Sequence, residues 1–382
     1  MSGKFHWKMF GAVIAALIHS IALSQNVRIA NVIELSGPGA SAGVQWRDAA
    51  ELAKDEINKS GGILGRQVEL MHFDTQTNPG VSRSQMLKAL EEKPHVVLGT
   101  IYSGSTKVNM ELTRQAEVPQ IVGAQGADLT QVGNPYLFRA NLGQQFGIPK
   151  VVTYLKDTIK ARSVSVVWVN DDFGKGGRKE FVAAAAAQGL KLGADVSTDA
   201  NQIDFTAAVL AAKNAGSDAV FVYLHEEESA RFLIAARKLG LETPMVGETT
   251  LLSQKVIDLA GSAVNGVRGF IPLTADAPVP AVKKFRMDFE KRFNYTPAHA
   301  GMQGYLAMHV IKAVAEANGN LDSKAFAKRL HGMTISAEKY PGVLMDTRWD
   351  ENGDVDRQTF MAEVVNGKQV ISQTILPAWQ KK

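Results

Sequence analysis

The sequence of 382 residues contains no cysteine, which excludes disulfide bonds, thiolate metal sites and lipid anchors attached through a thiol. It also lacks a strong charge of one sign, because 42 Lys and Arg stand against 38 Asp and Glu. The net charge of +4 is too small to indicate nucleic acid as a partner. Beyond the N-terminal segment no hydrophobic run approaches the length of a membrane span, and no low-complexity tract or strong linker is present.

The N-terminal segment has the pattern of an export signal. Two lysines precede an uncharged apolar run over residues 11–23, and this run ends in small residues. The run is too short to span a bilayer comfortably, which favours a cleaved signal peptide over a retained anchor. We expect residues 1–24 to be the signal peptide, with cleavage between Ser24 and Gln25.

The length indicates more than one domain. The remaining chain of about 358 residues exceeds what a single hydrophobic core normally supports, so we expect two domains. Because no obvious linker separates them, the sequence indicates a chain that passes between the two domains more than once.

The first part of the mature chain has the pattern of one βαβ unit. Residues 27–35 are apolar and rich in β-branched side chains, which is typical of a strand buried on both faces of a parallel sheet. Small and turn residues fill 36–43, apolar residues recur at helical spacing over 44–58, and residues 68–74 alternate as a second strand. We therefore expect a right-handed crossover.

Further strands alternate with helices along the chain. Strands are expected at 95–100, 119–123, 162–169 and 218–224, with an intervening alanine-rich helix and another that runs through 231–239. This alternation predicts an α/β protein with doubly wound parallel sheets, in which ligands bind at the carboxyl ends of the strands. The candidate binding loops are 36–43, 102–106, 124–128, 171–177 and 225–228.

One stretch of the sequence matches the consensus of a catalytic motif. Residues 39–43 fit the G-x-S-x-G pattern of a nucleophile elbow, with Ser41 between a strand and a helix. In that fold the oxyanion hole draws on an earlier loop, but Ser41 follows only one strand. An exported serine hydrolase therefore remains a distant alternative, and the small residues more simply allow a ligand or a second lobe to approach the backbone.

Metal and phosphate motifs are missing. The loop 171–177 has glycines and a lysine without the spacing of a phosphate-binding loop, and the eight histidines form no H-E-x-x-H pair. Residues 350–356 are acidic like a calcium loop, but their glycine stands at the wrong position. We interpret 350–356 as a solvated hairpin turn and expect neither a metal nor another cofactor.

The loop at 103–106 is the best candidate for holding an anion. Its hydroxyls and free backbone N–H groups stand where a strand ends and a helix begins, and the helix dipole favours negative charge there. Simple N-capping by Ser105 or Thr106 is an equally good interpretation of the same residues.

Several short motifs recur in a fixed order over nearly the whole mature chain: Ser36-Gly-Pro38, Ile57 to Gly65, Asp74, Gly99 to Thr106, Asp204-Phe205, Asp218-Ala-Val220, Gly240-Leu241, Gly247 and Trp349 to Asp354. Together they resemble the leucine/isoleucine/valine-binding protein family, the type I periplasmic binding proteins that serve ABC transporters. The resemblance implies two α/β lobes, each with a doubly wound parallel sheet, joined by three crossover strands. The implied lobes are 25–145 plus 273–355 and 146–272 plus 356–382.

The resemblance also implies a function. Proteins of this family close two lobes around a small ligand and pass the closed complex to an inner-membrane ABC permease, without making or breaking a bond. It therefore implies a periplasmic protein that is not an enzyme. A ligand that contacts both lobes shifts the open–closed equilibrium toward the closed form.

Carried over position by position, the resemblance implies a ligand site. Ser103 matches a serine that binds the carboxylate of an amino acid, and Ala124 matches a residue that contributes backbone there. Gly126 stands where a threonine hydroxyl is usual, and Phe173 and His225 stand at two aromatic positions of the second lobe. The acid that pairs with the ligand ammonium aligns with Thr249, while Glu248 is its neighbour.

Two ligand classes stay open. An aliphatic amino acid, above all a branched-chain one, requires an acid such as Glu248 for its ammonium group. An aromatic or other non-amino carboxylate does not, and Ala42, which replaces a frequent aromatic residue, leaves more room in the pocket, while Trp46 is expected to fill part of it. A sensory receptor ectodomain is a lesser alternative.

Overall fold

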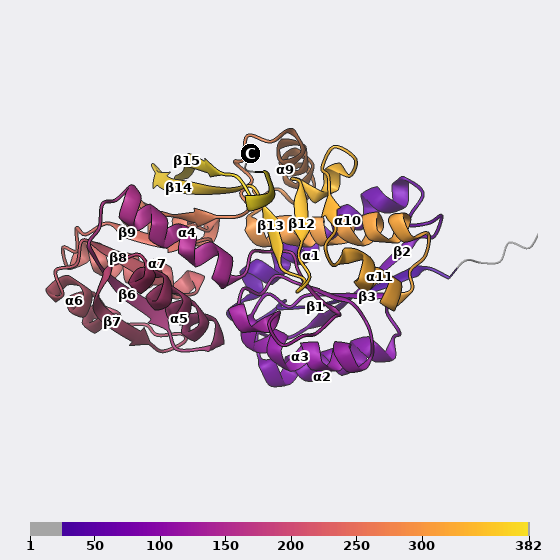
Figure 1. The fold of residues 1–382 in the computed structure, drawn as a ribbon, viewed down its shortest axis with the longest axis horizontal. Helices are drawn as coiled ribbons and strands as arrows, with labels where there is room; N and C mark the ends of the chain where they lie inside the picture. Colours follow the sequence, from indigo (N-terminus) through magenta and orange to yellow (C-terminus); the bar gives the residue numbers. More distant parts are fainter. Residues whose placement is uncertain (1–24, 381–382) are drawn as a thin grey trace, which may run out of the picture.

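The structure, a computed structural model, describes residues 25–380, in which the chain forms two α/β lobes joined side by side (Figure 1). The signal peptide expected at residues 1–24 lies outside the described residues. Within residues 25–380, no helix combines the length and the apolar character that crossing a membrane requires.

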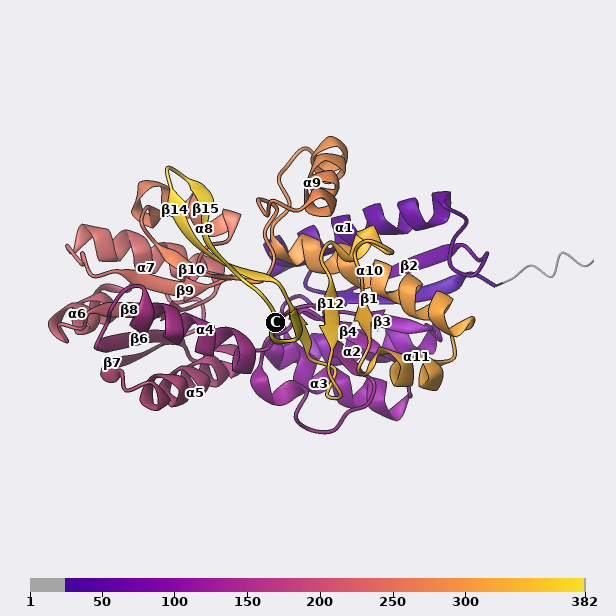
Figure 2. The same cartoon turned by 45° about the horizontal axis from the view of Figure 1, so that its top comes forward.

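The first lobe is built on a sheet of parallel strands in the order β2-β1-β3-β4-β5. Apolar side chains bury β1 on both faces, as the sequence pattern indicated. Helices α1 and α10 pack together on one face of this sheet, and α2 and α3 pack together on the other (Figure 2). The strands are β1 (Val27–Ile33), β2 (Val68–Asp74), β3 (Val96–Leu98), β4 (Gln120–Val122) and β5 (Leu137–Arg139), and the helices are α1 (Ala40–Lys59), α2 (Pro79–Glu91), α3 (Ser103–Gln115) and α10 (His299–Asn318).

The second lobe has a sheet in the order β15-β14-β10-β9-β8-β6-β7. Strands β6 to β10 are parallel, whereas β14 pairs antiparallel with β10 and β15 pairs antiparallel with β14. The strands are β6 (Ser163–Val169), β7 (Lys191–Thr198), β8 (Ala219–Tyr223), β9 (Met245–Glu248), β10 (Arg268–Ile271), β14 (Thr359–Val365) and β15 (Lys368–Ile375). The helices are α4 (Gln144–Asp157), α5 (Asp172–Ala187), α6 (Thr206–Asn214), α7 (Glu226–Lys238) and α8 (Gln254–Ala260).

A tight hairpin adds the two antiparallel strands, which the sequence analysis did not predict. Asn366 and Gly367 connect β14 to β15, and both have positive φ, at 49° and 73°. A two-residue turn with this backbone matches the twist of a hairpin, and the Asn-Gly pair is its strongest sequence signal.

The chain crosses between the lobes three times, which confirms the expected architecture. It leaves the first sheet after β5, returns after β10, and crosses again from β13 to β14 (Figure 2). Because each lobe is assembled from separate stretches of chain, two domains exist without a linker. The returning stretch contains α9 (Pro280–Phe293), α10, α11 (Ser323–Leu330) and a small sheet of β11 (Thr334–Ile335), β12 (Thr347–Trp349) and β13 (Val355–Arg357).

A buried ion pair ties the returning stretch to the first sheet. The Arg139 guanidinium at the end of β5 donates to Asp354 at 2.5 Å, and both side chains are almost fully buried. Asp354 belongs to the hairpin between β12 and β13, and this hairpin confirms the turn expected at 350–356. The turn is not simply solvated, however, because Asp354 faces inward to meet Arg139.

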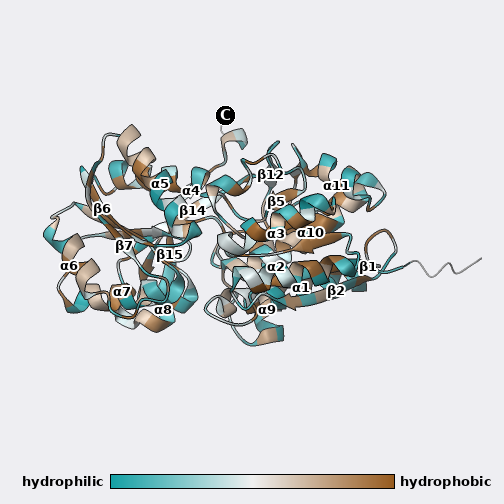
Figure 3. Cartoon of the chain, turned by 90° about the horizontal axis from the view of Figure 1, so that it is seen from below, coloured by the Kyte–Doolittle hydropathy of each residue, from teal (hydrophilic) through white to brown (hydrophobic). Residues whose placement is uncertain are grey.

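Both lobes have an apolar interior. The strands of the two sheets are predominantly apolar, and hydrophilic residues alternate with apolar ones along the helices that cover them (Figure 3). The rigid sheets hold the loops at their carboxyl ends against each other, and this arrangement positions the site described next.

Candidate ligand-binding site

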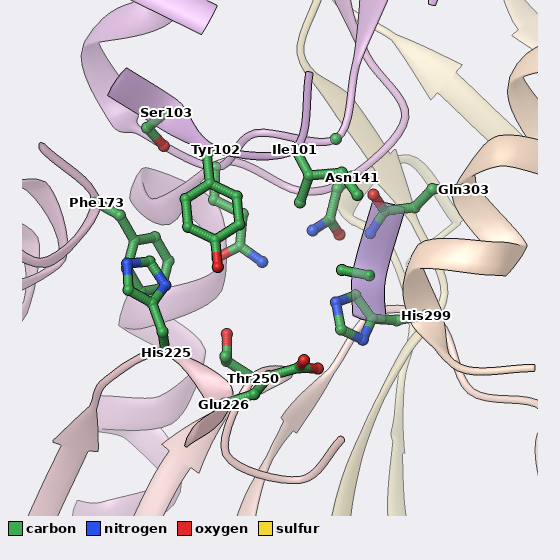
Figure 4. A pocket seen from close by; sticks show the side chains of 13 residues that line it. Ile101, Tyr102, Ser103, Asn141, Phe173, His225, Glu226, Thr250, His299 and Gln303 are labelled. Carbon is green, nitrogen blue, oxygen red and sulfur yellow. The ribbon is translucent and has the colours of Figure 1, made fainter. Parts of the chain in front are cut away.

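The carboxyl ends of strands from both lobes meet around a cavity, the inner cavity, which has a volume of about 60 Å³ (Figure 4). Its walls come from loops after β3, β4 and β5 of the first lobe, after β6, β8 and β9 of the second lobe, and from the start of α10. The lining residues are Ala42, Ile101, Tyr102, Ser103, Gly123, Gln125, Asn141, Phe173, His225, Glu226, Thr250, His299 and Gln303.

Ser103 is the first residue of α3, and its hydroxyl lies at the wall of the inner cavity. No side chain caps this helix, so Ser105 and Thr106 are not the N-caps that the sequence analysis considered. The Ser103 Oγ accepts a hydrogen bond of 3.1 Å from the backbone N–H of Gly126. A hydroxyl at an uncapped helix start offers both a donor and a favourable field for an anion.

Glu34 fixes the turn that presents Ser103. This side chain follows β1, is fully buried, and accepts hydrogen bonds from the backbone N–H groups of Ile101 at 3.1 Å and Tyr102 at 3.2 Å. Burial raises the pKa of Glu34 to about 7, although the two N–H groups favour the charged form. Gly43 is required nearby, because a Cβ there would stand 1.8 Å from the Glu34 carbonyl oxygen.

Aromatic rings from both lobes stack at one side of the cavity. Tyr102 of the first lobe stacks on His225 of the second, with centroids 4.8 Å apart, and His225 in turn stacks on Phe173 at 5.2 Å. The His225 Nε2 bonds to Asp171 at 2.6 Å. Burial opposes protonation of His225, but Asp171 together with Glu228 and Glu226 outweighs burial and raises the pKa of the imidazole. The stack therefore joins the two lobes across the cleft.

A second space, the outer cavity, also borders the Tyr102–His225 stack and has a volume of about 270 Å³. It shares Tyr102, Ser103, Phe173, His225 and Glu226 with the inner cavity, and acidic residues of the second lobe line much of it. An ion pair also links the lobes in this region: the Lys107 ammonium of α3 lies 2.7 Å from Asp172 at the start of α5.

The side of the inner cavity opposite the aromatic rings is polar. Asn141, His299 and Gln303 face the cavity there, and Phe173 and His225 stand across from them (Figure 4). Burial lowers the pKa of His299 to about 4, so the imidazole is neutral at neutral pH.

Of the residues that the sequence analysis selected, Ser103, Phe173 and His225 line the inner cavity together. Ala124 and Gly126 lie behind the wall, where their carbonyl oxygens accept hydrogen bonds from Arg139 at 2.5 and 2.6 Å. The lining residues that were not selected are Ile101, Tyr102, Gly123, Gln125, Asn141, Glu226, Thr250, His299 and Gln303, in addition to Ala42, which was noted as a neighbour.

Neither Glu248 nor Thr249 lines the inner cavity. Thr249 borders a separate pocket beside the start of α10. The Glu248 carboxylate lies next to Gly147 and has no hydrogen-bond partner within residues 25–380. Burial raises its pKa to about 8, although the nearby Tyr223 hydroxyl favours the charged form. Glu226, at the start of α7, is the carboxylate that the inner cavity contains.

Some of the lining residues that were not selected lie in loops that the strand pattern indicated, and others do not. Tyr102, Gln125 and Glu226 belong to loops that the strand pattern had selected, whereas Asn141, His299 and Gln303 come from segments without such a signal. Trp46, considered as a pocket filler, is fully buried behind Gly123 and donates to Asn31 at 3.0 Å.

Comparison with known proteins agrees with this geometry. The family model described as Periplasmic binding protein matches residues 26–369. The chain belongs to this family. This chain is 25% identical to the Leu/Ile/Val-binding protein of Escherichia coli strain K12. The alignment spans 359 residues and covers 91% of this chain and 93% of the relative.

Solved structures share the fold of this periplasmic binding protein. A leucine binding protein from Thermotoga maritima superposes with a TM-score of 0.83 at 22% identity, over 92% of this chain and 99% of the other. A solute binding protein of an ABC transporter from R. palustris, in complex with benzoate, gives the same TM-score of 0.83 at 19% identity, over 92% and 97%. The expected architecture of a type I periplasmic binding protein is thereby confirmed.

Proposed function

We propose that this protein is the solute-binding component of an ABC uptake system and holds a small carboxylate ligand, above all a branched-chain or other aliphatic amino acid. The observation that carries this proposal is the position of Ser103 at the start of α3, where it lines a cavity whose walls come from both lobes. The curated relative from Escherichia coli, named for leucine, isoleucine and valine, supports the amino-acid class.

The binding step follows from the charges around the inner cavity. The ligand carboxylate is held at Ser103 and the start of α3, and Glu226 pairs with the ammonium group because it is the acid that lines the cavity. Glu248 and Thr249 remain sequence-based predictions for that role. Nothing in this arrangement requires a bond to be made or broken, so the protein acts as a carrier and not as an enzyme.

Closure of the lobes completes the trap. A volume of about 60 Å³ holds only a few water molecules, so a solute enters when the lobes move apart. The Tyr102–His225 stack and the Lys107–Asp172 pair re-form as the lobes close. A ligand that contacts both lobes stabilises this closed form, which an inner-membrane permease then recognises.

The cellular location follows from the same proposal. We infer export of the protein to the periplasm, cleavage of the signal peptide between Ser24 and Gln25, and lobes formed by 25–145 plus 273–355 and by 146–272 plus 356–382. Strand membership in the two sheets supports this division. N-terminal sequencing of the exported protein measures the cleavage site directly.

An aromatic carboxylate is the second candidate ligand. The rings of Tyr102, His225 and Phe173 line the inner cavity and offer aromatic contacts to such a ligand, and the neighbour from R. palustris is in complex with benzoate. A thermal-shift screen of amino acids and aromatic acids separates the two classes, because a ligand that binds only the folded state raises the melting temperature. Shifts with benzoates and none with aliphatic amino acids would contradict the proposed amino-acid specificity.

Replacing Ser103 by alanine should weaken carboxylate binding by about 1–3 kcal/mol, because a hydrogen bond to a charged group is lost. Calorimetric titration of a ligand found in the screen measures the change. Ser105→Ala is the matched control: Ser105 lies on the same helix, its buried hydroxyl has no partner within the described residues, and it lines the outer cavity only. Unchanged affinity in Ser103→Ala would remove Ser103 from the site.

A further inference from the structure

The polar side of the inner cavity is built from two segments that are far apart in the sequence. His299 and Gln303 are one helical turn apart on α10 and therefore share a face of that helix. Asn141 comes from the segment that leaves the first lobe after β5. All three side chains converge on the cavity from the side opposite Phe173 and His225 (Figure 4).

Gln303 is the unusual member of this group. The residue is only 1% exposed, yet neither atom of its carboxamide has a hydrogen-bond partner within residues 25–380. The carboxamide lies close to Gly123: a Cβ atom added to this glycine would stand 2.6 Å from the Gln303 side-chain oxygen. Because an unpaired buried amide costs folding free energy, a group retained in this state at a cavity wall indicates a ligand that pairs with it.

The neighbours of Gln303 add neutral hydrogen-bonding groups. The Asn141 Oδ1 accepts from the backbone N–H of Leu142 at 3.0 Å, which orients the side chain and leaves its NH₂ group for the cavity. The His299 imidazole makes no hydrogen bond among the described residues and is neutral at neutral pH. This side of the cavity therefore offers donors and acceptors without a formal charge.

We propose that the inner cavity selects a carboxylate ligand whose far end carries a neutral group that both donates and accepts hydrogen bonds, such as a carboxamide. The inference rests on the carboxylate-binding part of the proposed function, since it takes Ser103 as the anchor of the ligand carboxylate, and it replaces the preference for an aliphatic side chain. A ligand carboxamide exchanges one N–H···O bond in each direction with Gln303. A hydrocarbon end leaves Gln303 unpaired, and a charged end meets no opposite charge at Asn141, His299 or Gln303.

Shape-matched amino acids test this preference directly. Leucine, asparagine and aspartate have similar shapes and differ in whether the end is apolar, amide or charged, and methionine, glutamine and glutamate form a longer set. Calorimetric titration with both sets should show that the amide of the better-fitting set binds at least tenfold more tightly than its apolar and charged counterparts. Equal or tighter binding of the apolar member would overturn the inference and leave the proposed function intact.

Two variants assign the preference to Gln303. Gln303→Met keeps the length of the side chain and removes its amide, so the tenfold preference should disappear while the apolar member still binds. Gln115→Met, at an exposed glutamine of α3, is the control and should keep the preference. If Gln303→Met does not fold, Gly123→Ala provides a second test. The added methyl group would collide with the Gln303 side-chain oxygen and shift its carboxamide, so this variant should also reduce the preference. A preference that survives in the folded variant would overturn the assignment.

If no amino acid binds, a pair of aromatic acids tests the preference for a polar end. In that case 4-hydroxybenzoate and 4-methylbenzoate, which differ by a hydroxyl in place of a methyl group, pose the same question. A tenfold preference for the hydroxyl supports the polar end and contradicts only the amino-acid specificity. Binding of neither series would contradict both the proposed carboxylate function and this inference.

Discussion

Replacing Arg139 by methionine is expected to lower the free energy of unfolding by about 3–5 kcal/mol, because the Asp354 carboxylate is left buried without its cation. Both side chains are at most 1% exposed, and the guanidinium also donates to the carbonyl oxygens of Ala124 and Gly126. The variant therefore loses a charge pair and two backbone contacts together. Urea denaturation followed by circular dichroism measures the change.

Two further variants show whether burial causes the effect. Arg268→Met removes a half-exposed pair with Glu363 at 2.8 Å and should cost less than about 1 kcal/mol, because water screens that pair. Adding Asp354→Leu to Arg139→Met removes the orphaned carboxylate and should restore part of the loss. A denaturation midpoint of Arg139→Met equal to that of the wild type would contradict the role assigned to this pair.

The stabilisation that Glu248 contributes is expected to be lost as pH rises from about 4.5 to about 8, whereas His299, whose pKa is lowered to about 4, acts in the opposite direction below about pH 6.5. Burial raises the pKa of Glu248 from 4.5 to about 8, so the folded protein keeps a proton that the unfolded chain has already released. In this window the folded state binds more protons, and deprotonation therefore favours unfolding. Glu34, whose pKa is raised to about 7, acts in the same direction.

Glu248→Gln should flatten this pH dependence, since the amide has a similar shape and no ionisable proton. The difference from the wild type should reach the order of a few kcal/mol near pH 8 and vanish below about pH 4.5, as measured by urea denaturation at each pH. Glu91→Gln, at an exposed position of α2, should follow the wild-type curve. Parallel curves for the wild type and Glu248→Gln would show that Glu248 is not protonated in the folded state.

The first βαβ unit shows how far local pattern leads. The strand expected at 68–74 agrees with β2, and the strand expected at 27–35 ends only slightly earlier, at Ile33. The helix expected from residue 44 begins at Ala40 instead, because the small residues 40–43 belong to α1 and not to a turn. Gly43 is small since the helix passes close to the Glu34 carbonyl, a tertiary contact that no local signal reveals.

Family resemblance selected single residues within loops that the strand pattern had already indicated. Ser103, Phe173 and His225 line one cavity, and the loops that hold them could be selected because strand ends of parallel sheets gather at one edge. The acid that the resemblance indicated, Glu248, ends β9 and does not line the inner cavity, whereas Glu226 at the start of α7 does.

The sequence by itself determined the α/β class and the order of strands and helices up to about residue 239, because hydrophobic period and turn residues act over a few neighbours. The tertiary structure alone decided which distant residues meet. Arg139 and Asp354 are 215 positions apart, and Asn141 joins His299 and Gln303 only because the chain returns to the first lobe. Such contacts depend on long-range packing, so the polar side of the cavity, and with it the proposed ligand preference, becomes visible only in the folded protein.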